Sequence, residues 1–287
     1  MIHLYPPEVI LRVGRRTPAL ALAVGLIAAL LAGTPVAAAS SPPPSSMASM
    51  GDSITRGFNA SGWFSDWPSR SFSTGTTSTV NSHYRRILAK NPAISGRNFN
   101  DGDSGAKADD MPGQATTVVG QGVQYVTILI GANDACTSTE AAMTPVATFR
   151  GHIDTALNTL KAGLPNAKIA VISIPDIKRL WEVGRTNSSA RSTWSLFGIC
   201  QSMLVNPTST AQVDEDRRNR VRQRVIDFNA QLAEACAAYG PNCDFDDNAV
   251  FNFAFLLSHV STWDYFHPNA SGQNVLAGVS YAAGFNW

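Results

Sequence analysis

Two short segments of this chain are apolar along almost their whole length and stop at a residue that breaks regular structure. Residues 124–130 end at Gly131, and residues 168–174 end at Pro175. Between them, residues 144–162 have the spacing of a helix. Strands without polar alternation are buried on both faces, as in a parallel sheet covered by helices. We therefore predict an α/β fold, a three-layer α/β/α sandwich with a mostly parallel sheet.

Weaker patterns complete the predicted layout. They indicate strands at 47–51 and 243–245 and helices at 81–90, 213–238 and 271–283, the last capped by Ser271. Residues 176–210 have little periodicity and predict an irregular insertion held by Cys200. No internal repeat or second domain is apparent. Because active residues of parallel sheets gather at the carboxyl ends of the strands, the site is expected there.

The first residues resemble an export signal. Arginines, including the Arg15-Arg16 pair, precede an apolar run at 19–32, and small residues lead to Ala39. A transmembrane anchor is the alternative, but the run is short for a span. We predict a signal peptide at 1–39, a flexible Ser/Pro leader at 40–46 and one domain at 47–287. The protein would then be secreted, extracellular and free of a transmembrane anchor after cleavage, with export by the general or the twin-arginine route left open.

The charge balance excludes one class of partner. Removing residues 1–39 takes away three Arg and one Glu, and leaves 19 basic and 20 acidic residues. No basic excess remains to follow a phosphate backbone, so nucleic acid is not expected as a partner. We expect a monomer.

The four cysteines are expected to form disulfides. An even number in an exported chain favours two bridges, and three pairings are possible. Cys236 and Cys243 flank a predicted turn, which favours Cys236–Cys243 and therefore Cys136–Cys200. A zinc site is the alternative, but no Cys-x-x-Cys spacing is present.

Ser53 is the candidate nucleophile. It follows the first predicted strand within Gly51-Asp52-Ser53, where a sharp turn would expose the hydroxyl. Gly-Asp-Ser alone is weak evidence, because it recurs at Ser104 without a preceding strand. The alternative for Ser53 is a turn or helix-capping serine.

Asp264 and His267 are the candidate acid and base. Their Asp-x-x-His spacing lets one turn carry both, with the carboxylate on one ring nitrogen and the other nitrogen free for Ser53. A surface pair is the alternative. His259 is the rival base, because it lies in the same late segment.

Asn133 and Gly105 are candidate oxyanion donors. Asn133 follows a predicted strand within Gly-x-Asn-Asp and can donate from its amide. Gly105 can donate its N–H to a substrate that approaches closely. The alternative for Asn133 is an Asn that bonds its own turn.

Together these blocks resemble the SGNH (GDSL-type) hydrolase family. The resemblance implies a flavodoxin-like sheet, Ser53 as nucleophile, His267 as base and Asp264 as its orienting acid. It also implies that the Ser53 and Gly105 N–H groups and Asn133 form the oxyanion hole. Ile54 departs from the Leu of the family motif. The chain is most similar to secreted bacterial esterases and phospholipase-B-like members.

We therefore predict a secreted serine carboxylic-ester hydrolase that works through an acyl-enzyme without cofactor or metal. A lipid or other small ester is the expected substrate, and an acetyl ester on a polysaccharide is the alternative. A non-catalytic module that binds glycan or a partner is a further alternative. Two groups of aspartates that are close in sequence could suggest a calcium site, but no complete calcium-binding loop is present. We therefore interpret them as solvated acids of turns: Asp101, Asp103, Asp244, Asp246 and Asp247.

Overall fold

The computed structural model describes residues 42–287, so the predicted signal peptide at 1–39 lies outside the described residues. Residues 42–46, expected to be a flexible leader, are held against the body of the protein. Asn91 Nδ2 donates to the carbonyls of Pro43 and Pro44, and the Ser45 N–H donates to Gln124 Oε1. These hydrogen bonds place residues 43–45 against the domain.

The sheet is parallel throughout and has the order β2-β1-β3-β4-β5. This order, with β1 between β2 and β3, is that of a flavodoxin-like sheet and confirms the predicted fold class. The strands are β1 (Met47–Gly51), β2 (Asn98–Asn100), β3 (Tyr125–Leu129), β4 (Lys168–Val171) and β5 (Cys243–Phe245). Every residue of β1 and β3 is buried, as their continuous apolar sequences predict.

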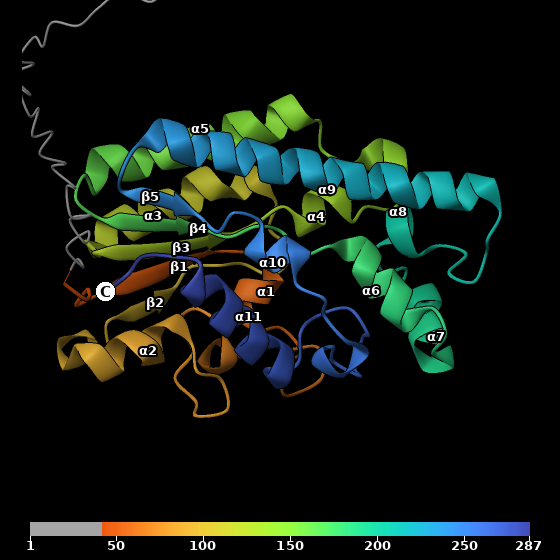
Figure 1. The fold of residues 1–287 in the computed structure, drawn as a ribbon, viewed down its shortest axis with the longest axis horizontal. Helices are drawn as coiled ribbons and strands as arrows, with labels where there is room; N and C mark the ends of the chain where they lie inside the picture. The colour runs from red at the N-terminus through yellow and green to blue at the C-terminus, as the bar shows by residue number, and fades with distance from the viewer. Residues whose placement is uncertain (1–41) are drawn as a thin grey trace, which may run out of the picture. The chain divides into compact units, whose positions relative to one another are not determined.

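Helices cover both faces of the sheet. Figure 1 shows α3, α5 and α9 on one face and α2 and α11 on the other. The α-helices are α1 (Ser53–Arg56), α2 (His83–Lys90), α3 (Met111–Gln121), α4 (Ala132–Ala135), α5 (Val146–Gly163), α6 (Ile177–Gly184), α7 (Ser188–Leu196), α8 (Gln201–Leu204), α9 (Gln212–Tyr239), α10 (Ala249–Asn252) and α11 (Ala270–Ala282). Short 3₁₀ turns occur at Pro68–Arg70, Pro92–Ile94, Ala108–Asp110, Glu140–Ala142 and Leu257–His259.

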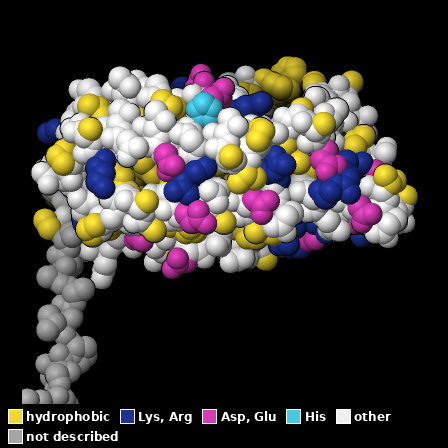
Figure 2. Space-filling model, turned by 90° about the horizontal axis from the view of Figure 1, so that it is seen from above, with side chains coloured by type: hydrophobic (Ala, Val, Ile, Leu, Met, Phe, Trp, Pro, Cys, Tyr) yellow, Lys and Arg dark blue, Asp and Glu magenta, His cyan; other side chains and the backbone are white. Residues whose placement is uncertain are grey.

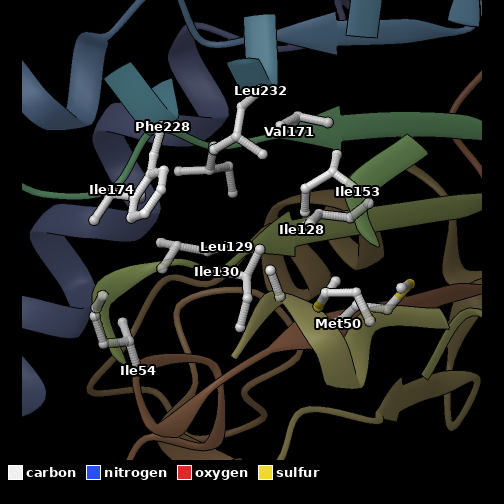
Figure 3. Close-up of a cluster of buried hydrophobic side chains, with 14 of the residues drawn as sticks. Met50, Ile54, Ile128, Leu129, Ile130, Ile153, Val171, Ile174, Phe228 and Leu232 are labelled. Atoms are coloured by element: carbon white, nitrogen blue, oxygen red, sulfur yellow. The ribbon is translucent and has the colours of Figure 1, made fainter. Parts of the chain in front are cut away.

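The core between the sheet and its helices is apolar (Figure 3). Ile128 and Val171 from the sheet belong to one buried cluster with Ile153 of α5 and Phe228 of α9. The rings of Phe149 and Phe228 stack with centroids 4.2 Å apart, which packs α5 against α9. Outside this core, the face over α5 and α9 carries basic and acidic side chains interspersed with small apolar ones (Figure 2).

Residues 176–210 differ from the sequence prediction, because they form α6, α7 and α8 rather than an irregular insertion. Asp176 and Asn187 cap α6 and α7 by accepting from the N–H groups of Lys178 and Ala190. The C-terminal helix is likewise capped by Asn269 and not by Ser271. The helices α6 and α7 bury Trp181 and Trp194, respectively. Helices this short show too little periodicity in their sequences to be predicted from it.

Two disulfides join the pairs that the sequence favoured. Cys136–Cys200 connects the end of α4 to the start of α8, and Cys236–Cys243 connects α9 to β5. Within residues 42–287, no helix combines the length and the apolar character needed to cross a membrane.

Candidate active site

Ser53 is the first residue of α1 and directly follows the buried strand β1. Gly51 has a φ of 148°, and a Cβ there would lie 2.2 Å from the Leu129 carbonyl oxygen, so the turn requires glycine. Asp52 caps α1 by accepting from the Ile54 N–H at 2.8 Å. This strand–turn–helix junction places α1, which begins at Ser53, at the carboxyl end of the sheet (Figure 1). Ile54 of α1 lines one pocket with Ala132 of α4 and Ile177 of α6.

His267 and Asp264 come from the segment before α11. The His267 Nε2 atom lies 2.8 Å from Ser53 Oγ, and Nδ1 lies 2.6 Å from Asp264 Oδ2. The other Asp264 oxygen accepts from the N–H groups of Phe266 and His267 at 2.9 and 3.0 Å. A carboxylate only accepts hydrogen bonds, so Nδ1 of a neutral ring carries the proton and Nε2 accepts from Ser53.

Asn59 is a residue of this network that sequence reasoning did not identify. Its Nδ2 donates to Asp264 Oδ2 at 2.6 Å, and its carbonyl accepts from Ser261 Oγ at 2.9 Å. Asn59 begins an Asn-Ala-Ser glycosylation sequence, but its side chain is 1% exposed and is therefore inaccessible to glycosylation in the folded protein. Asn59 therefore holds the carboxylate oxygen that faces the imidazole.

Burial and charge set the ionisation of the two aspartates. Burial would raise the pKa of Asp264, but the hydrogen bonds from His267, Phe266 and Asn59 and the charge of His267 outweigh it and lower that pKa. Asp52 is fully buried, and burial raises its pKa to about 7 against the opposing hydrogen bond from Ile54 and the charge of His267. Asp264 is thus an anion at neutral pH, whereas Asp52 is close to its midpoint.

The candidate oxyanion donors lie on two adjoining loops. Asn133, in α4, donates one amide hydrogen to the Ala106 carbonyl at 2.9 Å, which leaves its second hydrogen available. Asp134 Oδ2 accepts from the Ala108 N–H at 3.0 Å, so both side chains tie α4 to the Gly105 loop. Gly105 has a φ of 96°, and the space where its Cβ would lie is open.

The backbone donors are free to bind an oxyanion. Among residues 42–287, the N–H groups of Ser53 and Gly105 donate to no protein oxygen. The Ser53 and Gly105 N–H groups and the second amide hydrogen of Asn133 are therefore three hydrogen-bond donors without a protein acceptor among the described residues. Such donors stabilise charge that develops on a carbonyl oxygen in the transition state.

Gln114 is a second residue that the sequence did not single out. Its side chain from α3 accepts from the Gly51 N–H at 2.7 Å and donates to the Gly51 carbonyl at 2.9 Å. The amide acts as an additional strand partner at the end of β1. It therefore fixes the backbone two residues before Ser53.

The competing candidates are engaged elsewhere. Ser104 Oγ donates to Asp66 at 2.6 Å, and His259 accepts from the Leu256 N–H. Another histidine, His83, is buried between Tyr125 and Ser280. Burial lowers the pKa of His83 to about 3. Asp246, considered for calcium, accepts from Ser173 and Val250. In the part of the chain that the structure describes, no group of three His, Cys, Asp or Glu side chains is placed to hold a metal.

An apolar pocket adjoins His267. Its wall includes Ile54 and Ala132, the chain neighbours of Ser53 and Asn133, together with the His267 ring. The α6 helix and the residues just before it supply Pro175, Ile177, Leu180 and Val183, and the segment between α10 and α11 supplies Phe255 and Phe266. Asp176 also lines it, but its carboxylate is paired with Arg222 at 2.7 Å. This pocket suits a hydrocarbon group.

Comparisons with known proteins agree with this geometry. A family model described as GDSL-like Lipase/Acylhydrolase matches residues 47–278. The chain is 28% identical over 212 residues to membrane-associated phospholipase B1 of Rattus norvegicus, an alignment that covers 61% of this chain and 14% of the rat protein. It is 30% identical over 165 residues to the Homo sapiens protein of that name, covering 47% and 11%. This chain therefore spans only a small part of the length of either relative.

Solved structures share the fold. A protein of Parabacteroides merdae described as a GDSL-like lipase matches with a TM-score of 0.51 at 18% identity, covering 83% of this chain and 94% of that one. A catalytic mutant of an acetylxylan esterase from Geobacillus stearothermophilus matches with a TM-score of 0.52 at 16% identity, covering 84% and 95%.

Proposed function

The chain belongs to the GDSL-like lipase/acylhydrolase family, and we propose that it is an exported enzyme that cleaves lipid-type carboxylic esters through an acyl-enzyme on Ser53. The family membership confirms the resemblance seen in the sequence and makes the protein a serine ester hydrolase. The observation that carries the assignment of roles is the hydrogen-bonded row Ser53 Oγ–His267–Asp264, with separations of 2.8 and 2.6 Å.

The reaction follows from these contacts. His267 Nε2 accepts the Ser53 proton as Oγ attacks the ester carbonyl carbon, and Asp264 stabilises the imidazolium that forms. The oxyanion accepts from the Ser53 and Gly105 N–H groups and from Asn133 Nδ2. When the intermediate collapses, His267 protonates the leaving alcohol. A water molecule, deprotonated by His267, then attacks the acyl-enzyme and releases the acid and free Ser53.

The apolar pocket supports an acyl chain longer than acetyl. Its wall, which includes Ile54, Ala132 and His267, is built mainly from apolar side chains, and each methylene buried against such a wall contributes about 0.8 kcal/mol. An acetyl group would leave this wall unused. The acetylesterase alternative therefore ranks second, and a non-catalytic module would have no use for the intact Ser53–His267–Asp264 row.

Export is part of the proposal. It is supported by the signal-like sequence at 1–39 and by two disulfides, which persist in oxidising compartments. Detection of the protein in culture medium with a new N-terminus near Ser40 would test this part.

The activity itself is tested with nitrophenyl esters of increasing acyl length, followed by phospholipid and acetylated xylan. We expect kcat/KM to rise from acetyl to medium-length chains and Ser53→Ala to abolish turnover. Ser104→Ala is the matched control, because Ser104 lies in the second Gly-Asp-Ser and contacts Asp66 instead of a histidine. Highest activity on acetylated xylan, or full activity in Ser53→Ala, would contradict the proposal.

A further inference from the structure

An exposed group of aromatic side chains lies close to the active site. It consists of Trp63, Phe64, Phe197 and Trp263, which are 47–63% exposed and which we call the aromatic rim. The Trp63 ring lies 5.4 Å from Phe64 and 6.3 Å from Trp263 between centroids, and Phe64 lies 5.4 Å from Phe197. Leu196, beside Phe197, is 78% exposed. Soluble proteins rarely leave a contiguous apolar group of this kind in water unless it is a contact surface.

The rim is continuous with the catalytic base. The Phe58 ring lies 6.2 Å from Phe64 on one side and 4.9 Å from the His267 ring on the other. A row of ring contacts therefore leads from the exposed surface to the residue that contacts Ser53. Whatever binds the rim is held next to the entrance of the reaction site.

The backbone holds these rings outward. Phe64 has a φ of 42°, in the left-handed region that a bulky residue rarely adopts. The loop that carries it is closed by the Asn59 N–H, which donates to the Ser65 carbonyl at 2.9 Å. Phe197 lies three residues before Cys200, whose disulfide fixes that segment to α4. The segments that carry Phe64 and Phe197 are therefore anchored separately, and both hold their rings exposed.

We propose that the aromatic rim docks the enzyme onto a lipid–water interface and so presents an aggregated lipid ester to Ser53. This inference rests on the proposed function for its substrate, but the docking step is independent of catalysis. Trp side chains, with an apolar body and one N–H, are suited to the boundary between acyl chains and water, and Phe and Leu are suited to the acyl region.

The geometry of the rings favours lipid over a glycan chain. A sugar stacks flat on an aromatic face. Trp63 and Trp263 are tilted by 31°, but Trp63 and Phe64 meet at 73° and Phe64 and Phe197 at 61°, so the four rings form no common flat platform. Rings that meet edge to face present edges and faces together, as in an apolar surface that inserts among acyl chains. The highly exposed aliphatic Leu196 has no role in stacking a sugar.

The adsorption should depend on apolar contact and not on charge. The described residues carry 19 basic and 20 acidic side chains, and the face over α5 and α9 mixes both signs (Figure 2). No basic excess is present to attract an anionic surface. Vesicles of uncharged net composition are therefore the appropriate probe, and high salt should not release the protein.

The test compares two matched double variants. Leu196→Ser with Phe197→Ser removes one end of the rim. Val213→Ser with Phe99→Ser removes an aliphatic and an aromatic side chain of similar exposure, 71% and 37%, that lie outside the rim. Both proteins are measured for thermal unfolding, for kcat/KM on a dissolved short-chain nitrophenyl ester, and for sedimentation with phosphatidylcholine vesicles.

We expect the rim variant to bind vesicles about 10- to 100-fold more weakly than the control variant. Its kcat/KM on the dissolved ester should stay within about twofold of the control, while hydrolysis of the vesicle-borne ester falls with binding. The proposal would be overturned by equal vesicle binding of the two variants or by release of the wild type from vesicles in 1 M salt. It would also be overturned if the rim variant lost binding to insoluble acetylated xylan but not to vesicles. If vesicle binding depends on the rim but no ester is cleaved, the proposed function fails and the docking surface remains.

A second measurement needs no variant. Brominated phosphatidylcholine should quench part of the wild-type tryptophan emission, because Trp63 and Trp263 would enter the acyl boundary. Emission unchanged by brominated vesicles at a saturating lipid concentration would contradict docking through the rim, even if the double variant failed to fold.

Discussion

The His267 Nε2 atom lies 2.8 Å from Ser53 Oγ, although 214 residues separate the two in the sequence. Two structural features produce this contact. The strand β1 ends at Gly51 and turns Ser53 outward, and the turn that precedes α11 bonds Asp264 to the backbone of His267. The active arrangement therefore depends on the carboxyl end of the sheet, where the turn after β1 meets the turn before α11.

Asn59 should act as a positioning residue for Asp264. Asn59→Ala removes the 2.6 Å hydrogen bond to Asp264 Oδ2, so the carboxylate loses a partner and the imidazole its fixed orientation. We expect kcat to fall by roughly 10-fold with KM nearly unchanged, as for loss of one hydrogen bond to a charged group. Asn187→Ala is the control, because it removes the cap of α7 and should lower stability while leaving kcat unchanged.

Asn133→Ala should remove one oxyanion donor. Loss of such a donor typically lowers kcat by about 100- to 1,000-fold. Because the interaction forms in the transition state, KM should change little. Steady-state kinetics on a dissolved ester measures this, and a kcat equal to the wild-type value would exclude Asn133 from the oxyanion hole.

Asp52 should make the protein less stable as pH rises through the acid range. Its folded pKa is raised to about 7, whereas an unfolded Asp titrates near 4. Between these values the unfolded chain releases a proton that the folded protein keeps, so the free energy of unfolding decreases as pH increases, by about 1.4 kcal/mol for each unit of pKa difference. Asp264 has the opposite effect: its lowered pKa contributes stability above the unfolded value, and that stability is lost as pH falls.

Urea unfolding at several pH values separates the effect of Asp52 on stability from that of Asp264. Asp52→Asn should flatten the loss of stability between about pH 4 and 7, because the amide mimics the neutral acid and can still accept from Ile54. A wild-type stability that rises monotonically to pH 7, with the same slope in Asp52→Asn, would show that Asp52 is ionised in the folded protein.

Leu180→Trp should shorten the apolar pocket. The larger side chain fills space beside α6 that an acyl chain would occupy. We expect kcat/KM to fall by at least about 10-fold for an octanoyl ester, since each excluded methylene forfeits about 0.8 kcal/mol, and to change little for acetyl. Val213→Trp adds comparable bulk at an exposed site on α9 and should leave the chain-length profile as it is. A uniform loss over all chain lengths would point to a damaged fold instead.

The Cys136–Cys200 disulfide should stabilise the protein more than Cys236–Cys243. The first closes a separation of 64 residues and the second one of 7, which by loop closure corresponds to about 4 and about 2 kcal/mol. Replacing both cysteines of each pair by Ser and measuring urea unfolding tests the order. The first replacement should also weaken selection of acyl length, because the bridge connects α4 to α8, and α8 packs against α6 of the pocket wall. Equal losses in the two variants would contradict this ranking.

Features that depend on local sequence were predictable. Five elements were predicted to within a few residues: the apolar strands β1, β3 and β4 and the long helices α5 and α9. Each of these segments shows either a continuous apolar sequence or a helical period. β2 was not expected, since three residues of a short edge strand carry little signal. The helices of 176–210 were also missed, because their first turns rely on Asp176 and Asn187 as caps and each helix is short.

The residues of the candidate site also fall into a group that was predicted from local sequence and a group that was not. Ser53, Gly105, Asn133, Asp264 and His267 were candidates because each stands in a recognisable block, and the structure brings Ser53, Asp264 and His267 into one hydrogen-bonded row. Asn59 and Gln114 were not found, because their partners lie 205 and 63 residues away and their own surroundings resemble ordinary loop and helix. Contacts of this kind require the fold before they can be identified.

The most direct measurement locates the covalent adduct of a fluorophosphonate probe by peptide mass spectrometry. We expect a single modified residue, Ser53. Labelling should be slowed strongly by His267→Ala and left unchanged by His152→Ala, because His152 lies on α5 outside the site. An adduct on Ser104 or another residue, or unchanged labelling of Ser53 when His267 is replaced, would contradict it.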